Sequence, residues 1–160
     1  MGGVLKIYEG MSQIEKLRFS QMAALRLKDI DYDVYQECIK YSKRKIDDPD
    51  LLGIIMLEIL NEYELIPDNY PIILSTAYWF IAPSKILYKE LKIKIGFRSV
   101  IQKAMGFNRP ESVSMYSTNL DVYYKNPRFK QKVHSVGERI LKGLQESGYI
   151  EKDSSEWGTE

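Results

Sequence analysis

This sequence contains very few of the residues on which catalytic and metal sites are usually built. Among its 160 residues it has one cysteine, Cys38, and one histidine, His134. A single cysteine excludes an internal disulfide and a cysteine metal cluster, and a single histidine excludes a metal site with two histidine ligands in one chain. The glycines at 2, 3 and 10 lack the spacing and the preceding strand of a phosphate-binding loop. We therefore predict a protein that is not an enzyme, with no catalytic residue, no metal site and no cofactor.

Long hydrophobic runs are also absent. The two longest, 51–60 and 71–83, reach only about half of the ~20 residues that a membrane-spanning helix requires. The apolar start of the chain is followed at once by Lys6, Glu9 and Glu15, which is not the pattern of a signal peptide. We predict no membrane association and a cytoplasmic location, and a single cysteine suits a reducing compartment.

The net charge is small, but the charges are sorted along the chain. The formal net charge is +1, yet the blocks 1–84, 85–142 and 143–160 carry −4, +9 and −4. The cationic block also contains seven aromatic residues: Tyr88, Phe97, Phe107, Tyr116, Tyr123, Tyr124 and Phe129. Cations that neutralise phosphates and rings that stack on bases are typical of nucleic-acid-binding surfaces. A lysine-rich solvated face, or a face for an acidic protein partner, is the alternative explanation.

Helix signals dominate the first half, and 44% apolar residues are too many for a disordered chain. Ser12 and Glu15 have the spacing of a capping box, which predicts a helix over about 12–28 with an apolar face. Asp33 is expected to cap a second helix. Asp48 followed by Pro49 predicts the start of a third, apolar on nearly every side, which should be the buried centre of this half.

The second half is expected to begin after a turn at 67–71. Residues 72–81 predict a short buried helix, although periodicity over this length does not exclude a buried strand. Ser84 is expected to cap a helix over 85–94 that Gly96 ends, and a further short helix should close at Met105. Residues 106–127 are expected to form an ordered loop.

The last segment has the clearest pattern. Over 130–146, Val133, Val136, Ile140 and Leu144 lie within a narrow arc of a helical projection, which predicts an amphipathic helix. Gly148 is suited to the left-handed cap that ends it. Residues 149–152 then read as a short terminal strand.

This segment resembles the recognition helix and following strand of winged-helix nucleic-acid-binding proteins. The matching residues are Leu141, Leu144, Gly148, Tyr149, Ile150, Glu151 and Lys152. The helix and charge signals predict a mostly α fold with an acidic N-terminal helical unit over 1–68, and the resemblance implies a basic winged-helix-like unit over 69–160 that carries the terminal strand. One compact domain that includes both is the alternative.

The resemblance also implies that the exposed side of the last helix faces nucleic acid. The candidate residues are Arg128, Lys130, Lys132, Ser135, Arg139 and Lys142, joined from the rest of the basic block by Arg98, Lys103 and Arg109. Glu138 lies among them, which favours a plain solvated face instead.

The sequence therefore predicts a non-catalytic nucleic-acid-binding protein, for DNA or RNA, that acts as a regulator or as a subunit of a nucleoprotein assembly. The alternative is an all-helical protein-interaction subunit of a larger complex. A third hypothesis, a magnesium-dependent nuclease, would use Asp29, Asp31, Asp33, Asp47, Asp48 and Asp50, but helix caps and turns explain these carboxylates more simply. The apolar helix after Asp48 predicts a homodimer or a protein partner on the N-terminal half.

Overall fold

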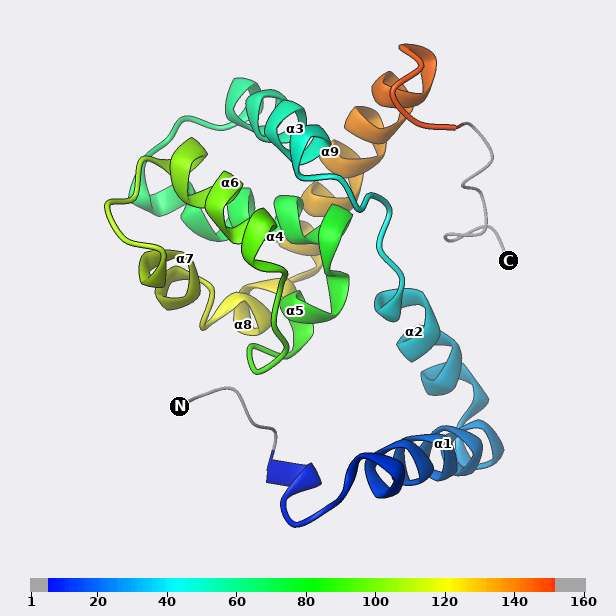
Figure 1. Ribbon diagram of the computed structural model, residues 1–160. Coiled ribbons are helices and arrows are strands. Elements are labelled where there is room, and N and C mark those ends of the chain that lie inside the picture. The colour runs from blue at the N-terminus through cyan, green and yellow to red at the C-terminus, as the bar shows by residue number, and fades with distance from the viewer. Residues whose placement is uncertain (1–5, 152–160) are drawn as a thin grey trace.

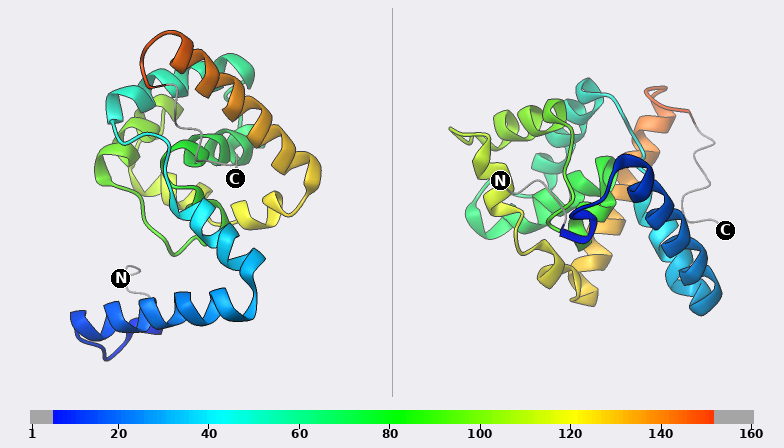
Figure 2. Two further views of the ribbon diagram at one scale, coloured as in Figure 1. Left: turned by 90° about the vertical axis from the view of Figure 1, so that its right-hand side faces the viewer. Right: turned by 60° about the horizontal axis from the view of Figure 1, so that its bottom comes forward.

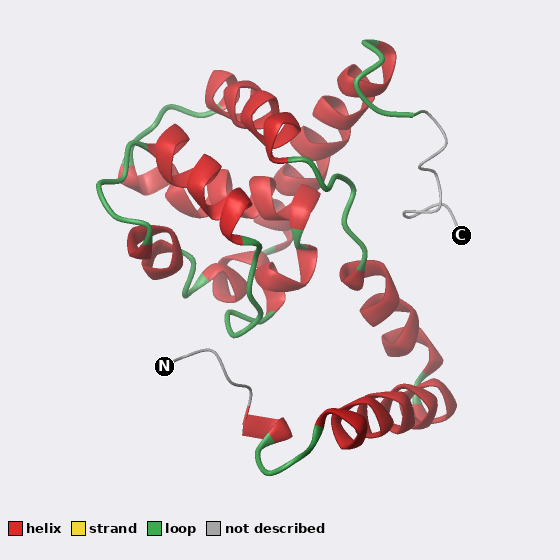
Figure 3. Ribbon diagram, in the orientation of Figure 1, coloured by secondary structure: helices red, strands yellow, loops and turns green. Residues whose placement is uncertain are grey.

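The computed structural model describes residues 6–151 and leaves residues 1–5 and 152–160 outside the description. Helices joined by loops build the described chain, which contains no strand (Figure 3). The helices are α1 (Gln13–Ile30), α2 (Tyr32–Ser42), α3 (Pro49–Glu62), α4 (Tyr70–Ile81), α5 (Pro83–Leu87), α6 (Ile95–Met105), α7 (Glu111–Tyr116), α8 (Leu120–Tyr124) and α9 (Pro127–Glu146), with short 3-10 helices η1 (Lys6–Tyr8) and η2 (Pro67–Asn69). The predicted mostly α fold is confirmed.

The first two helices form an arm that projects from the body of the molecule (Figures 1 and 2). The predicted capping box is present, because the Ser12 hydroxyl accepts a hydrogen bond from the Glu15 amide and the Glu15 carboxylate accepts one from the Ser12 amide. α1 packs on α2, and α2 packs on α5 at the edge of the body. No residue of α1 is buried. The apolar face predicted for this helix is therefore exposed to solvent.

The centre of the core is α4 rather than the third helix. Every residue from Ile72 to Ile81 is buried, and α3, α5, α8 and α9 pack around this helix. The helix predicted over 72–81 is confirmed, and the strand is excluded. α3 begins as predicted, with the Asp48 carboxylate capping it and Pro49 in its first turn. Its apolar residues are covered by α4, α6 and α9, except for exposed Leu57. None of the helices in the described range is long and apolar enough to cross a membrane.

α9 crosses α4 at close range. The predicted inner face is confirmed, since Val133, Val136, Ile140 and Leu144 are buried. α9 begins three residues earlier than predicted, because Asn126 caps it by accepting hydrogen bonds from two amides of the first turn. Its end is also as predicted: Gly148 has φ +82° and, with Tyr149, returns hydrogen bonds to the last turn of the helix.

Several predicted boundaries are wrong. The cap of α2 is Asp31, whose carboxylate accepts from the Val34 amide, and Asp33 lies in the first turn. Ser84 lies inside α5 and caps nothing in this helix, which ends at Leu87. The ammonium of Lys85 donates to the Lys89 carbonyl at 2.7 Å and helps to close the turn that follows. The predicted 85–94 helix is therefore one and a half turns long, and Gly96 lies within α6 instead of ending a helix.

The winged-helix architecture is not formed by the described residues. Tyr149 and Ile150 lie in a bend, where a terminal strand was expected, and Lys152 lies outside the described range. Without a strand in this range there is no sheet on which the predicted strand could pair. Residues from both sides of the expected boundary at 68/69 contribute to one hydrophobic core, which includes Ile55 of α3 and Ile140 of α9.

Candidate nucleic-acid interface

The predicted contact residues of α9 fall into two groups. Five of them follow one another at intervals of three or four positions and lie on one exposed stripe of the helix: Arg128, Lys132, Ser135, Arg139 and Lys142. We call these five the α9 stripe. Lys130 is exposed on a different side, with its ammonium 5.5 Å from the ring centre of Tyr124. The structure therefore places Lys130 apart from the predicted surface.

The other three predicted contact residues lie elsewhere on the molecule. Arg98 and Lys103 belong to α6, and Arg109 lies in the loop that follows it. α6 packs on α3 and α7, whereas α9 packs chiefly on α4 and α8 (Figures 1 and 2). These residues share with α9 only the basic block of the sequence. The fold places these three cations on another face.

Acidic side chains of α3 border the C-terminal part of the α9 stripe. A carboxylate oxygen of Glu62 lies 2.5 Å from the Arg139 guanidinium, and Glu58 lines a groove together with Arg139. Glu138 is exposed on the same helix. These carboxylates oppose the positive charge near Arg139, whereas one carboxylate, that of Asp68, borders the N-terminal end of the stripe.

At that N-terminal end a groove combines cations with aromatic rings. Arg128 and Lys132, one helical turn apart, line it together with Tyr63, Tyr123 and Phe129. The remaining lining residues are Asp68, Asn69, Pro71, Ile72, Val122 and Asn126. The rings of Tyr123 and Phe129 are 5.6 Å apart between centroids and tilted by 33°. We call this the aromatic groove. Of the three rings only that of Tyr123 is exposed, and guanidinium and ammonium groups beside such a ring can contact phosphates and a base together.

Sequence reasoning did not find the groove as a unit. Tyr123 and Phe129 were recognised only as aromatics within the basic block, and Tyr63 was not singled out. Tyr63 comes from the end of α3, which the fold brings to α9 from about sixty positions away in the sequence. Burial and nearby Glu62 raise the pKa of its hydroxyl, so it is a neutral ring that can donate a hydrogen bond.

A chain of hydrogen bonds joins three side chains, Tyr41, Tyr124 and His134, away from the α9 stripe. The hydroxyl of Tyr124 is 2.8 Å from the hydroxyl of Tyr41 and 2.6 Å from Nε2 of His134. Burial raises the pKa values of both tyrosines. Burial, followed by the nearby ammonium groups of Lys40 and Lys130, lowers the pKa of His134 to about 4. His134 is therefore neutral at pH 7 and adds no charge to the candidate interface.

Lys45 lies in the same part of the core. Its ammonium donates to the Trp79 carbonyl at 2.9 Å and lies 3.5 Å from the centre of the indole ring. Burial lowers its pKa to about 6, against an opposing effect of Glu138. This amine links α4 to the segment after α2 and is not part of the exposed basic surface.

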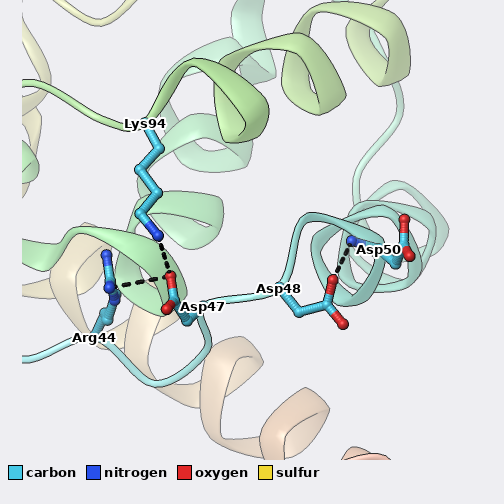
Figure 4. Close-up of polar contacts among 5 residues, drawn as sticks. All are labelled: Arg44, Asp47, Asp48, Asp50 and Lys94. Carbon is cyan, nitrogen blue, oxygen red and sulfur yellow. Dashed lines mark hydrogen bonds and ion pairs between the residues drawn. The ribbon is translucent and has the colours of Figure 1, made fainter.

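Three of the six aspartates considered for a nuclease, Asp31, Asp47 and Asp48, cap helices or form ion pairs. The Asp48 carboxylate accepts from the Asp50 amide at 2.9 Å, and Asp47 contacts Arg44 at 3.0 Å and Lys94 at 2.6 Å (Figure 4). Hydrogen bonding to Lys94 lowers the pKa of Asp47. Within the described range, no group of three or more histidine, cysteine or carboxylate side chains is arranged to hold a metal ion.

Comparison of the chain with protein families, curated proteins and solved structures found no match.

Proposed function

We propose that this protein is a non-catalytic nucleic-acid-binding protein that acts as a regulator or as a subunit of a nucleoprotein assembly. The observation that carries this proposal is the aromatic groove, in which Arg128 and Lys132 accompany exposed Tyr123 and half-buried Phe129. Phosphates would contact the two cations, and an unpaired base would stack on the tyrosine ring. Ser135 and Lys142 would extend the contact along α9, while Arg139, already paired with Glu62, would have a secondary part.

The resemblance to winged-helix proteins enters this proposal only through α9. In that architecture a helix of this kind lies in a major groove, and its exposed side chains reach base edges. Residues 6–151 contain no strand that could form a wing, so only the helix would contact nucleic acid. Single-stranded DNA or RNA therefore suits the groove better than a duplex, because only unstacked bases can reach Tyr123.

The test is a binding titration of three labelled ligands: duplex DNA, single-stranded DNA and structured RNA, each at about 0.05 and 0.2 M salt. The test variant combines Arg128→Glu, Lys132→Glu and Lys142→Glu. The control combines Arg98→Glu, Lys103→Glu and Arg109→Glu, which changes the net charge by the same amount on another face. We expect the first variant to lose at least tenfold in affinity and to show a shallower salt dependence, and the control to bind nearly as the parent does.

Equal losses in the two triple variants would indicate attraction by net charge alone and contradict the assigned surface. A parent protein that binds none of the three ligands would contradict the function itself. Circular dichroism of each variant verifies that the helices are retained.

The alternative function, an all-helical protein-interaction subunit, is favoured by one specific observation. α1 carries large exposed apolar side chains along its whole length, among them Leu17, Met22 and Ile30. Exposed apolar patches of this kind mark contact surfaces between proteins. The two functions are compatible, because α1 and the α9 stripe lie on different parts of the molecule (Figure 1).

A further inference from the structure

One carboxylate lines the aromatic groove among its cations. Asp68, in the 3-10 helix η2 that precedes α4, borders the same groove as Arg128, Lys132 and Tyr123. Its side chain is exposed, and within the described range its carboxylate forms no hydrogen bond or ion pair. A fixed negative charge repels phosphates, so Asp68 weakens any ligand that the groove holds through phosphates alone. The carboxylate becomes favourable when the ligand brings hydrogen-bond donors to it.

The size and lining of the groove fit one nucleotide of a strand. Its volume is about 700 Å³, within the range of pockets that hold small organic ligands. Phe129 packs beside the ring of Tyr123 at 5.6 Å between centroids, and Tyr123 stays 48% exposed. A base can therefore stack on Tyr123 while the adjoining phosphates contact Arg128 and Lys132. The edge of the stacked base is left for the other polar groups that line the groove.

A carboxylate distinguishes the bases by their hydrogen-bond patterns. It accepts and cannot donate, so it binds best to two donors that lie side by side. Guanine carries such a pair on its Watson–Crick edge, the N1–H and the N2 amino group. On adenine and cytosine the amino group lies beside a ring nitrogen that accepts, and on thymine and uracil the N3–H lies between two carbonyl groups. Each of these edges therefore repels one of the two carboxylate oxygens.

Asn126 supplies a complementary donor to the same groove. Its side-chain oxygen accepts from the amides of Arg128 and Phe129, which fixes the orientation of the side chain. The Nδ2 group makes no hydrogen bond within residues 6–151, so it can donate to a ligand. On guanine the O6 carbonyl follows directly after N1–H and can accept from such an amide. A carboxylate and an amide donor together match the groups on the edge of this base.

We propose that the aromatic groove selects a guanine in a single strand, with the Asp68 carboxylate accepting from N1–H and N2–H of the base and Asn126 donating to O6. This selection rests on the proposed nucleic-acid binding and names the base that the same site takes. Tyr123 supplies the stacking surface, and Arg128 and Lys132 supply the phosphate contacts. Neither interaction distinguishes one base from another, so Asp68 is the residue that determines specificity.

The first measurement compares single-stranded DNA oligonucleotides of about eight nucleotides, in which one central base is varied within a run of thymines. The central base is guanine, hypoxanthine, adenine, cytosine or thymine. We expect guanine to raise the affinity over thymine by about 5- to 150-fold, the range that a bidentate base contact gives. Hypoxanthine lacks the N2 amino group, so its oligonucleotide should bind with an affinity between those of guanine and thymine.

Asp68→Asn should remove the preference for guanine, because the new side-chain amide cannot accept both hydrogen bonds. The all-thymine oligonucleotide should bind this variant at least as tightly as it binds the parent, since a charge that repels phosphates is gone. The matched control is Glu64→Gln, which removes an exposed carboxylate from the same connection between α3 and α4 but outside the groove. This control should keep the preference for guanine.

Asp68→Ala is a second variant, which leaves no hydrogen-bonding group at position 68 and should also bind the five oligonucleotides equally. Circular dichroism verifies that the helices are retained, because a carboxylate just before α4 also stabilises the start of that helix. Guanosine monophosphate serves as a competitor, and it should bind at least tenfold more weakly than the guanine oligonucleotide because it offers one phosphate to two cations.

Failure of this selectivity and failure of the proposed function give different results. A parent that binds none of the oligonucleotides contradicts both. A parent that binds all five equally, or prefers another base, overturns the selection of guanine and leaves the nucleic-acid binding in place. A preference for guanine that persists in Asp68→Asn, or that Glu64→Gln also removes, overturns the part assigned to Asp68. Equal affinity for guanosine monophosphate overturns a strand as the ligand.

Discussion

Gly137 of α9 lies directly against the indole ring of Trp79 in α4. A Cβ atom at position 137 would be 2.5 Å from Cε3 of the ring, well inside the distance that two carbon atoms tolerate. Trp79 is fully buried, with Lys45 over its ring and Phe80 in edge contact at 4.9 Å between centroids. The close crossing of α9 and α4 therefore depends on the absence of a side chain at position 137.

We predict that Gly137→Ala destabilises the protein by about 1–3 kcal/mol, the usual cost of forcing an extra methyl group into a packed core. The matched control is Gly143→Ala in the same helix, where a Cβ atom would meet nothing within 4 Å. Alanine should there stabilise the helix by about 0.5–1 kcal/mol. Urea unfolding of both variants checks this, and two changes of the same sign would contradict the tight crossing.

The pH dependence of stability should report on His134. Its pKa is about 4 in the folded protein and 6.5 in an unfolded chain, so the unfolded state binds more protons between these values. Stability is therefore lost as pH falls from 6.5 towards 4, at up to about 1.4 kcal/mol per pH unit. A neutral ring can accept the Tyr124 hydroxyl at Nε2, whereas a protonated ring cannot.

The variant that isolates this effect is His134→Gln, which keeps a hydrogen-bond acceptor near Tyr124 but does not titrate. Urea unfolding at intervals between pH 4 and 6.5 should show a smaller slope of unfolding free energy against pH than in the parent. If the slope of unfolding free energy against pH is the same in His134→Gln and in the parent, other groups, chiefly carboxylates, cause the pH dependence. This result would contradict the low pKa of His134.

Local chemistry was the part of this fold that the sequence could predict. Ser12, Asp48 and Gly148 act within a few residues of themselves, and the structure uses all three as predicted. The prediction of a helix over 85–94 was wrong because the apolar pattern of the sequence continues past Leu87. In the structure the chain turns there, around the buried Lys85. Periodicity also identified an apolar face on α1 but could not indicate whether the rest of the chain covers it.

The candidate site shows the same limit. Helical spacing was enough to place Ser135, Arg139 and Lys142 on one stripe of α9. It could not show that Glu62 of α3 pairs with Arg139, or that Tyr63 reaches the aromatic groove, because these contacts join residues far apart in the sequence. Arg98 shows the converse. It belongs to the same basic block of the sequence as α9, but in the folded protein it lies on α6, on another face.

The last prediction concerns the aromatic groove and separates stacking from charge. Tyr123 is 48% exposed, so Tyr123→Ser removes a stacking surface and leaves the cations of the α9 stripe intact. We expect the affinity for single-stranded DNA or RNA to fall by about 1–3 kcal/mol, the usual contribution of one base stacked on an aromatic ring. The salt dependence should not change, because Arg128 and Lys132 remain.

The matched control is Tyr88→Ser, which removes a tyrosine that is 62% exposed within the same basic block but outside the groove. This variant should bind as the parent does. Duplex DNA should be bound equally by both variants and the parent, because its bases are already stacked on one another and cannot reach the ring at position 123. If Tyr123→Ser loses the same affinity for duplex and single strands, the groove contacts the phosphate backbone alone. If both tyrosine variants lose the same affinity, the binding surface is not the aromatic groove on α9.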